Sequence, residues 1–285
     1  MREERRAVPR RGIPLRAVIP NAITALALCS GLTAIRFAIS GDWDEALACI
    51  GVAAVLDGMD GRIARALRGQ TRFGAELDSL SDVIAFGVSP AIIVHLWVLQ
   101  ALPRFGWLFA LAYAVCMALR LARFNARIDA EDQPHKSAGF LTGVPAPAGA
   151  GLMLLPILLW LASDQQWAWL RDYRLVAPWA GFAAFMVISS IATWSLGSLR
   201  LRRSVRLEAI VFIALLGGAL FIAPWHTLSL VVIVYLALTP FSMASYARVR
   251  RLRAGHAAAP QPAAAPLPEG RPARRRRLPP NAPSE

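Results

Sequence analysis

Cysteine, histidine and acidic residues are all scarce in this chain of 285 residues. The three cysteines show no paired spacing, which excludes a disulfide framework and a zinc site built on cysteine pairs. The four histidines are scattered with no recurrent spacing, so we expect none of them to ligate a metal. Long polar segments are also few, because 56% of the residues are hydrophobic. Such a composition is too apolar for a soluble domain, whose surface must be largely polar.

Long apolar runs are abundant instead, and the mean hydropathy is +0.46. A helix of about 20 apolar residues crosses the hydrocarbon core of a bilayer. We therefore predict an all-α fold: a polytopic transmembrane helical bundle of about eight spans, with a six-helix core plus two. Six true crossings are the alternative. The runs lie near residues 20–40, 43–67, 83–101, 105–124, 145–163, 176–196, 207–223 and 226–247.

The positive charges indicate the orientation of these spans. With the N-terminus in the cytoplasm, 27 of the 31 basic residues fall in segments predicted to be cytoplasmic. Eight of the nine tryptophans fall near predicted outer ends, where indoles favour the interface. We therefore expect both termini in the cytoplasm and a multi-pass protein of the cell (inner) membrane. Topology accounts for the net charge of +13, so we expect no nucleic-acid partner.

Composition also divides the chain. Residues 1–17 are a basic cytoplasmic segment, and we expect the apolar run after it to be an uncleaved first helix. Residues 18–200 form the main membrane domain, and 201–250 add two C-terminal spans. Residues 251–285 are rich in Ala, Pro and Arg, so we predict a disordered cytoplasmic tail.

Four aspartates lie in or beside apolar spans, where carboxylates are costly and mark candidate functional sites. On the second predicted helix, Asp57 and Asp60 share one face with Gly61 and Ala64. On the third, Gly74, Asp78 and Asp82 follow at four-residue intervals and also share one side. Both groups are predicted near the cytoplasmic boundary.

Four converging carboxylates repel one another unless cations neutralise them. Carboxylate ligands suit Mg²⁺ or Mn²⁺, and four acids suffice for two ions, an arrangement that fits a pyrophosphate substrate. The structural alternative is a network of ion pairs between these acids and arginines 62, 65, 68 and 72. A metal-ion or solute transporter is a more remote alternative, because its acids belong near the bilayer midplane.

The pattern Asp-x2-Asp-Gly-x2-Ala-Arg-x8-Gly-x3-Asp-x3-Asp resembles the signature of the CDP-alcohol phosphatidyltransferases, and the segment from Asp57 to Asp82 matches it without a gap. Three other segments resemble the phosphatidylserine synthase branch of that family. They are Ile19-Pro-Asn-Ala-Ile-Thr, Arg120-Leu-Ala-Arg-Phe-Asn125 and Phe140-Leu-Thr-Gly143-Val-Pro-Ala-Pro147. The resemblance covers roughly residues 18 to 200.

The resemblance implies transfer of a phosphatidyl group from CDP-diacylglycerol to L-serine with release of CMP, at a cytoplasmic-facing site and usually in a homodimer. Membrane lipid is then both the substrate's source and the protein's surroundings. The family pattern implies metal ligation by Asp57, Asp60, Asp78 and Asp82, and it favours Asp82 as general base. It also implies a CDP site bordered by Asp57, Gly61, Ala64, Arg65 and Gly74.

Several alternatives stay open at this stage. Asp82 is either the base or only a metal ligand. Arg120, Arg123 and Asn125 are candidates for binding the serine carboxylate, but the two arginines also suit membrane-interface anchors. Residues 140–147 form an interfacial turn or a wall of the acceptor site. Ser190 and Ala192 stand where we expect Arg and Pro in serine synthases, so a sister enzyme using glycerol 3-phosphate or inositol phosphate is the nearest alternative.

Overall fold

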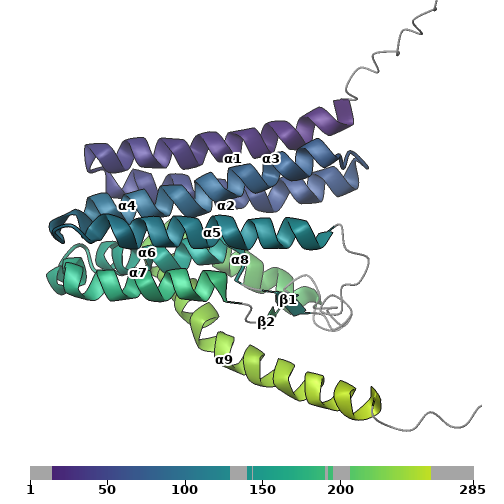
Figure 1. Ribbon diagram of the computed structural model, residues 1–285. Helices are drawn as coiled ribbons and strands as arrows, with labels where there is room; N and C mark the ends of the chain where they lie inside the picture. Colours follow the sequence, from purple (N-terminus) through teal and green to yellow (C-terminus); the bar gives the residue numbers. More distant parts are fainter. Residues whose placement is uncertain (1–14, 129–139, 143, 190–191, 195–205, 258–285) are drawn as a thin grey trace, which may run out of the picture. The chain divides into compact units, whose positions relative to one another are not determined.

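The computed structural model describes residues 15–128, 140–142, 144–189, 192–194 and 206–257, and nearly all of them are helical (Figure 1). Two three-residue strands, β1 (Phe140–Thr142) and β2 (Ala192–Trp194), pair antiparallel with Leu141 opposite Thr193. The α-helices are α1 (Leu15–Ser40), α2 (Trp43–Ala66), α3 (Arg72–Asp82), α4 (Ser89–Trp97), α5 (Gly106–Ile128), α6 (Ala146–Ala162), α7 (Tyr173–Ile188), α8 (Arg206–Ile222) and α9 (Pro224–Ala257). A π-helix, η1 (Val83–Val88), joins α3 to α4, and η2 (Leu99–Ala101) and η4 (Ala168–Arg171) are 3₁₀ turns.

Within the described residues, four helical segments are long and apolar enough to cross a bilayer: Val18–Ser40, Arg72–Trp97, Gly106–Ala126 and Pro224–Phe241. Three shorter apolar helices, Ala146–Ala162, Tyr173–Ile188 and Ile210–Ile222, accompany them. Large apolar side chains are widely exposed on these helices; Phe221, for example, is 92% exposed. Exposure on this scale suits contact with lipid and not with water. The chain is therefore a helical membrane protein, as its composition predicts.

The bundle is held together where small residues let helices approach closely. α1 packs along α2 and also against α3 and α4. A Cβ added at Gly31 of α1 would lie 2.7 Å from the Cα of Ala85 in η1, so this crossing requires glycine. At Gly149 of α6, an added Cβ would lie 2.9 Å from the Cε of Met117 in α5. Such contacts are typical of helix packing in membranes.

The third predicted helix is continuous from α3 through η1 into α4, but its hydrogen-bond pattern changes directly after Asp82. The Tyr113 hydroxyl of α5 donates to the Phe86 carbonyl of η1 at 3.1 Å. Ser89 donates to the carbonyls of Gly31 at 2.8 Å and Ile84 at 2.9 Å. These bonds tie the π-helix to α1 and α5, and π-turns of this kind are frequent at functional sites.

The prediction of a sixth span over residues 176–196 is wrong at its C-terminal end. The helix α7 ends at Ile188, Ser189 is extended, and Ala192–Trp194 is a strand. An apolar run does not by itself distinguish helix from strand, and pairing with a distant segment decided the matter here. Segment 140–147 is accordingly not a simple turn, since it supplies β1 and then the start of α6.

Some predictions fall outside the described residues: those for the basic segment up to residue 14, for Gly143, for Ser190 and for the tail from residue 258. The chain divides into two compact units, Met1–Tyr246 and Ala247–Glu285. The four aspartates belong to the first unit. The predicted boundaries at residues 18, 200 and 250 stay predictions.

Candidate active site

The four aspartates predicted from the sequence come from two helices that meet at the same end. Asp57 and Asp60 lie in the last three turns of α2, and Asp78 and Asp82 lie in α3. The connection between the helices is short. Arg68 takes a positive φ of 51° in it, and Thr71 caps α3 by accepting a hydrogen bond from the Gly74 backbone N–H at 3.0 Å. This tight turn places the carboxylates of α3 beside those of α2.

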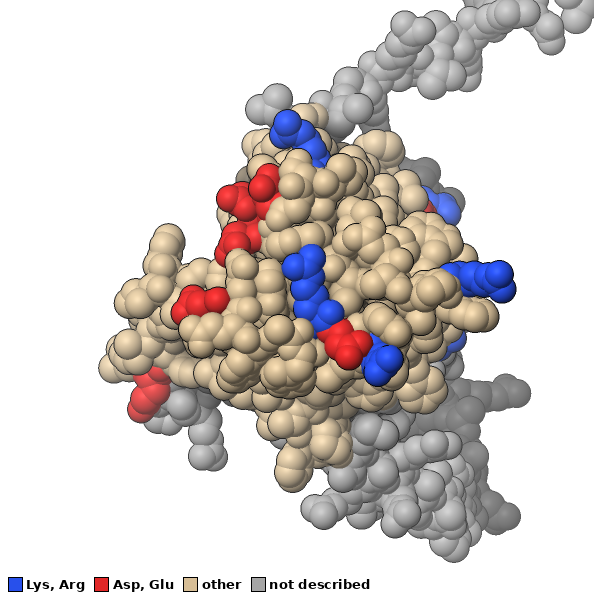
Figure 2. Space-filling model, turned by 90° about the vertical axis from the view of Figure 1, so that its left-hand side faces the viewer, with Lys and Arg blue, Asp and Glu red and all other residues tan. Residues whose placement is uncertain are grey.

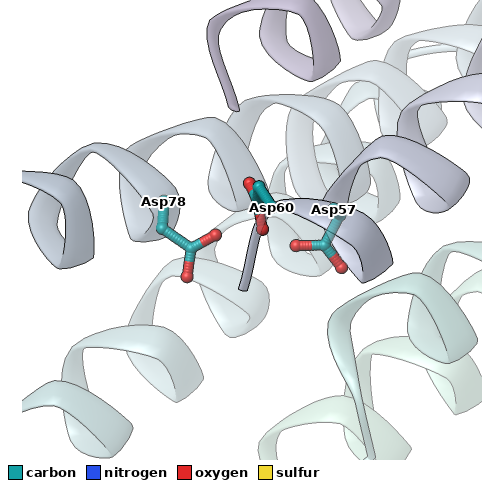
Figure 3. A group of neighbouring side chains, drawn as sticks. All are labelled: Asp57, Asp60 and Asp78. Atoms are coloured by element: carbon teal, nitrogen blue, oxygen red, sulfur yellow. The ribbon is translucent and has the colours of Figure 1, made fainter. Parts of the chain in front are cut away.

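Three of the carboxylates form a group that is able to hold a metal ion (Figure 3). Asp57, Asp60 and Asp78 each offer one oxygen, and these oxygens all lie within 4.8 Å of one another. Asp60 is 5% exposed, whereas Asp57 and Asp78 are half-buried. Three convergent, partly buried carboxylate oxygens are a donor set that suits a hard divalent cation. The residues present therefore fit the metal that the motif predicts.

Asp82 lies beside this triad and is not part of it. Its carboxyl group is within hydrogen-bonding distance of Asp57, and the two can share a proton or a cation. The Arg120 guanidinium of α5 also interacts electrostatically with Asp82. The structure thus brings together all four predicted aspartates, but it gives Asp82 a different environment.

A cavity of about 380 Å³ opens next to Asp60 and Asp78. Four of the five residues predicted to border the CDP group line it: Gly61, Ala64, Arg65 and Gly74. The fifth, Asp57, is not among the lining residues, although it belongs to the metal-competent triad.

The cavity is tight on the α3 side. A Cβ added at Gly74 would lie 2.8 Å from the Asn21 Oδ1 atom and 3.2 Å from the Thr71 Oγ1 atom. At Gly61, by contrast, an added Cβ would make only an ordinary contact, 3.8 Å from Nη1 of Arg65. A side chain at position 74 would therefore have to displace the end of the Asn21 side chain, whereas a Cβ at Gly61 would fit without displacing any atom.

Sequence reasoning missed several polar residues of this cavity. Asn21 and Thr24 of α1 line it, and so do Gln70 and Thr71 of the turn before α3. Asn21 and Thr24 belong to the segment Ile19–Thr24, whose resemblance to the family was evident but which carried no assigned role. Their two polar side chains, three residues apart on an apolar helix, were the available signal.

The three acceptor candidates on α5 point in different directions. Arg120 is half-buried; its Nη1 atom contacts the Met117 sulfur at 3.7 Å, and none of the described residues accepts a hydrogen bond from its buried Nε. Asn125 faces α3, where its amide atoms lie 2.9 and 3.1 Å from the Ser79 hydroxyl. Arg123 is exposed and donates from Nη1 to the Ile188 carbonyl at 3.3 Å, at the end of α7. Arg120 and Asn125 therefore reach the aspartate-bearing helix, whereas Arg123 reaches α7.

A residue outside the predicted catalytic core also approaches Arg120. Tyr235 of α9 interacts electrostatically with this guanidinium, as does Tyr113 of α5. Helix α9 also approaches α6, since a Cβ added at Gly151 would lie 2.8 Å from Cγ2 of Val232. One residue of α9, Tyr235, thus reaches the surroundings of the site.

Comparison with known proteins agrees with this geometry. The model of the CDP-alcohol phosphatidyltransferase family matches residues 17–194, and a second model, CDP-alcohol phosphatidyltransferase 2, matches residues 205–240. The chain belongs to the CDP-alcohol phosphatidyltransferase family. The resemblance seen in the motif from Asp57 to Asp82 is thereby confirmed.

Several curated relatives carry the name CDP-diacylglycerol--serine O-phosphatidyltransferase. The protein of that name from Mycobacterium tuberculosis is 37% identical over 236 residues, which is 83% of this chain and 81% of the relative. The one from Mycobacterium leprae is 36% identical over 82% of this chain and 77% of its own length. The one from Helicobacter pylori is 30% identical over 77% of this chain and 88% of its own length.

Proposed function

We propose that this protein transfers the phosphatidyl group of CDP-diacylglycerol to the hydroxyl of L-serine and releases CMP. The observation that carries the proposal is the triad Asp57, Asp60 and Asp78, with its oxygens within 4.8 Å, at the edge of a cavity lined by the small residues of the motif. The names of the relatives support serine as the acceptor.

We infer that the four aspartates hold two divalent ions, Mg²⁺ or Mn²⁺. When bound, such ions neutralise charge on the pyrophosphate and on the departing CMP. Asp57, Asp60 and Asp78 provide the convergent oxygens, and Asp82 lies at hydrogen-bonding distance from Asp57. An uncompensated group of four acids at this depth would be costly, which supports a site built for cations.

The CDP group is proposed to occupy the cavity between α1, α2 and α3. Gly61, Ala64 and Gly74 leave room for it because none of them extends beyond Cβ. Arg65 lines the same cavity and carries the charge needed to pair with a phosphate. Asp57 would border the CDP group through the metal site and not through the cavity wall.

The reaction is an in-line displacement at the phosphorus atom that bears diacylglycerol. The serine oxygen forms a bond to that phosphorus, the bond from phosphorus to the CMP oxygen breaks, and the serine hydroxyl proton passes to a base. We propose Asp82 as that base, supported by its position outside the triad. In the alternative, Asp82 is a fourth metal ligand, and another group or water accepts the proton.

Arg120 is the candidate best placed to bind the serine carboxylate. Its guanidinium lies near Asp82, and its buried Nε atom has no acceptor among the described residues. An incoming carboxylate would supply one, in a charge-assisted hydrogen bond. Asn125, which donates to the Ser79 hydroxyl of α3, is proposed to border the same acceptor site. Arg123 remains a third candidate, and its bond to Ile188 equally suits an interfacial anchor.

The proposal includes eight spans, formed by the four long apolar helices, the three shorter ones and α2. Both termini, and the active site, would face the cytoplasm across the cell (inner) membrane. The concentration of basic residues around the connection between α2 and α3 supports this orientation. We also propose a homodimer, a catalytic domain over residues 18–200 and two additional spans over 201–250.

The decisive experiment is CMP release by the purified protein in detergent with CDP-diacylglycerol and Mn²⁺ or Mg²⁺. Serine, glycerol 3-phosphate, inositol phosphate and no acceptor are compared side by side. Release that requires serine supports the proposal. Release with a phosphorylated acceptor instead would mean that the protein is a phosphatidyltransferase whose acceptor is not serine. No release with any acceptor would contradict phosphatidyl transfer.

A further inference from the structure

Thr24 of α1 makes a short side-chain hydrogen bond to the metal-competent triad. Its hydroxyl lies 2.6 Å from Oδ2 of Asp60. Both side chains are buried, Thr24 at 4% exposure and Asp60 at 5%. A length of 2.6 Å is the one expected when a hydroxyl donates to an ionised carboxylate. The contact is therefore strong and directional.

The hydroxyl has one proton and two possible acceptors. The Pro20 carbonyl, one helical turn earlier, lies 3.1 Å away, as is common for threonine inside a helix. The Asp60 oxygen is nearer by half an ångström and carries more negative charge. We therefore infer that the Thr24 hydroxyl donates its hydrogen bond to the Asp60 carboxylate. One carboxylate oxygen is then fixed by Thr24, and the other remains available as a ligand.

Thr24 also connects the two helices that carry the aspartates. The Ser81 hydroxyl of α3, which is 3% exposed, donates to the Thr24 backbone carbonyl at 3.2 Å. Ser81 directly precedes Asp82. Thus one residue of α1 bonds to Asp60 of α2 through its side chain and to the neighbour of Asp82 through its main chain. Since α1 packs against both helices, Thr24 bridges them at the site.

We propose that Thr24 is a positioning residue that orients Asp60 for metal binding and keeps the aspartates of α2 and α3 in register. The inference rests on the proposed metal site but not on the identity of the acceptor alcohol. Groups that orient the ligands of a metal contribute about tenfold to a hundredfold to its affinity. Loss of the Thr24 hydroxyl should therefore weaken metal binding by about tenfold or more.

The test compares Thr24→Val, which keeps the shape but removes the donor, with Thr24→Ser, which keeps the donor. Thr33→Val is the matched control: Thr33 is on the same helix, is exposed, and donates only to the Cys29 carbonyl at 2.7 Å. Each purified protein is titrated with Mn²⁺, and free Mn²⁺ is followed by electron paramagnetic resonance. The Mn²⁺ concentration for half-maximal CMP release is measured in parallel, and thermal unfolding in detergent checks the fold.

We expect Thr24→Val to bind Mn²⁺ about tenfold more weakly or worse, with Thr24→Ser within about threefold of wild type and Thr33→Val unchanged. In an Asp60→Asn background, Thr24→Val should add no further loss, because Thr24 acts through Asp60. If Thr24→Val does not fold, Thr24→Ala and Ser81→Ala take its place, with the same direction expected.

Equal Mn²⁺ binding by wild type and Thr24→Val, or equal losses in the Ser and Val variants, would overturn the positioning role alone. If the wild-type protein binds Mn²⁺ but releases no CMP with serine, the positioning role of Thr24 still stands and serine is excluded as the acceptor. Wild-type protein that binds no Mn²⁺ would overturn both ideas.

Discussion

The two ends of the helical bundle both carry polar groups and a cavity, but they differ in how the charges are held. At the end formed by α2 and α3, carboxylates are buried or half-buried and converge within 4.8 Å. At the opposite end, which faces the viewer in Figure 2, acidic and basic side chains are scattered over the surface. Asp42, Asp44 and Glu45 lie there at the start of α2, and all three are exposed.

The opposite end also has the larger cavity, of about 550 Å³. It lies between Trp97, Trp160 and Arg171; the Arg171 Nε donates to the Trp97 carbonyl at 3.3 Å, and its guanidinium stacks 5.5 Å from the Trp160 ring centre. These contacts satisfy the cation with aromatic and carbonyl partners at a tryptophan-rich membrane interface. Volume therefore does not identify the active site in this molecule. Convergent, buried like charges mark the candidate active site instead, because a bound cation would offset the cost of burying them.

The largest effect should come from removing one buried carboxylate. Asp78→Asn takes one oxygen ligand from the triad, so we expect CMP release to fall by about a thousandfold. Asp44→Asn is the control at the other end, where the exposed carboxylate only favours the N-terminus of α2, and it should change the rate less than about twofold. Steady-state CMP assays at saturating Mn²⁺ measure both. Comparable losses of activity in the two variants would contradict the claim that only the aspartates at the α2 and α3 end take part in the reaction.

A smaller effect is expected at Asp82, which stands beside the triad. If it is the base, Asp82→Asn should lower kcat by about a hundredfold and remove the decline of the rate at acidic pH, because that decline reports protonation of the base. Asp82→Glu should keep the decline at a displaced pH. Measurement of kcat across pH for the three proteins decides the matter. An acidic decline in Asp82→Asn identical to that of wild type would assign Asp82 to metal binding only.

The acceptor site gives the third contrast. Arg120→Gln should raise the KM for serine by about tenfold to a hundredfold, the loss expected when a charged hydrogen bond to a carboxylate is removed. Arg171→Gln removes a guanidinium from the opposite cavity and should leave the KM for serine within about twofold, since it perturbs only local packing. Initial-rate measurements over a range of serine concentrations compare them. A KM that responds equally to both changes would exclude Arg120 from the acceptor site.

The smallest effect concerns space and not charge. Gly74→Ala places a Cβ 2.8 Å from the Asn21 oxygen, so we expect the KM for CDP-diacylglycerol to rise by about fivefold, as overpacking of a tight site does. Gly51→Ala on α2 meets no atom within 4 Å and should leave this KM unchanged while slightly stabilising the helix. Kinetics with varied CDP-diacylglycerol at fixed serine measure both. No rise for Gly74→Ala would mean that the substrate does not approach this wall.

Most of the helical architecture was accessible from the apolar runs, because a membrane helix must satisfy its backbone hydrogen bonds internally and so leaves a long apolar signature. The C-terminal end of the sixth run could not be predicted in this way, since strand β2 exists only through pairing with β1, which is about 50 residues away in sequence. The π-turn after Asp82 was equally hidden, because it depends on Tyr113 and Ser89 reaching carbonyls of other segments.

The candidate site divides in the same way. The spacing predicted one face for Asp57 and Asp60 on the second helix and one side for Asp78 and Asp82 on the third, and in the structure the oxygens of Asp57, Asp60 and Asp78 lie within 4.8 Å of one another. The contribution of Thr24 could not be derived, because it lies 36 residues from Asp60 and meets it only when α1 packs on α2. The sequence also did not show that Arg120 and Arg123 point to different neighbours. Arg120 interacts with Asp82 of α3, whereas Arg123 donates to the Ile188 carbonyl of α7.

By itself the sequence determined that this is a helical membrane protein of the CDP-alcohol phosphatidyltransferase family with carboxylates on two adjacent helices. The membrane character follows from composition, the shared faces follow from spacing along single helices, and the family follows from the resemblance of the motif from Asp57 to Asp82. Only the tertiary structure decided which three oxygens converge, that Asp82 stands beside them next to Arg120, and that Thr24 holds Asp60. These relations join α1, α2, α3 and α5, and they arise from close packing at small residues such as Gly31, which no single helix encodes.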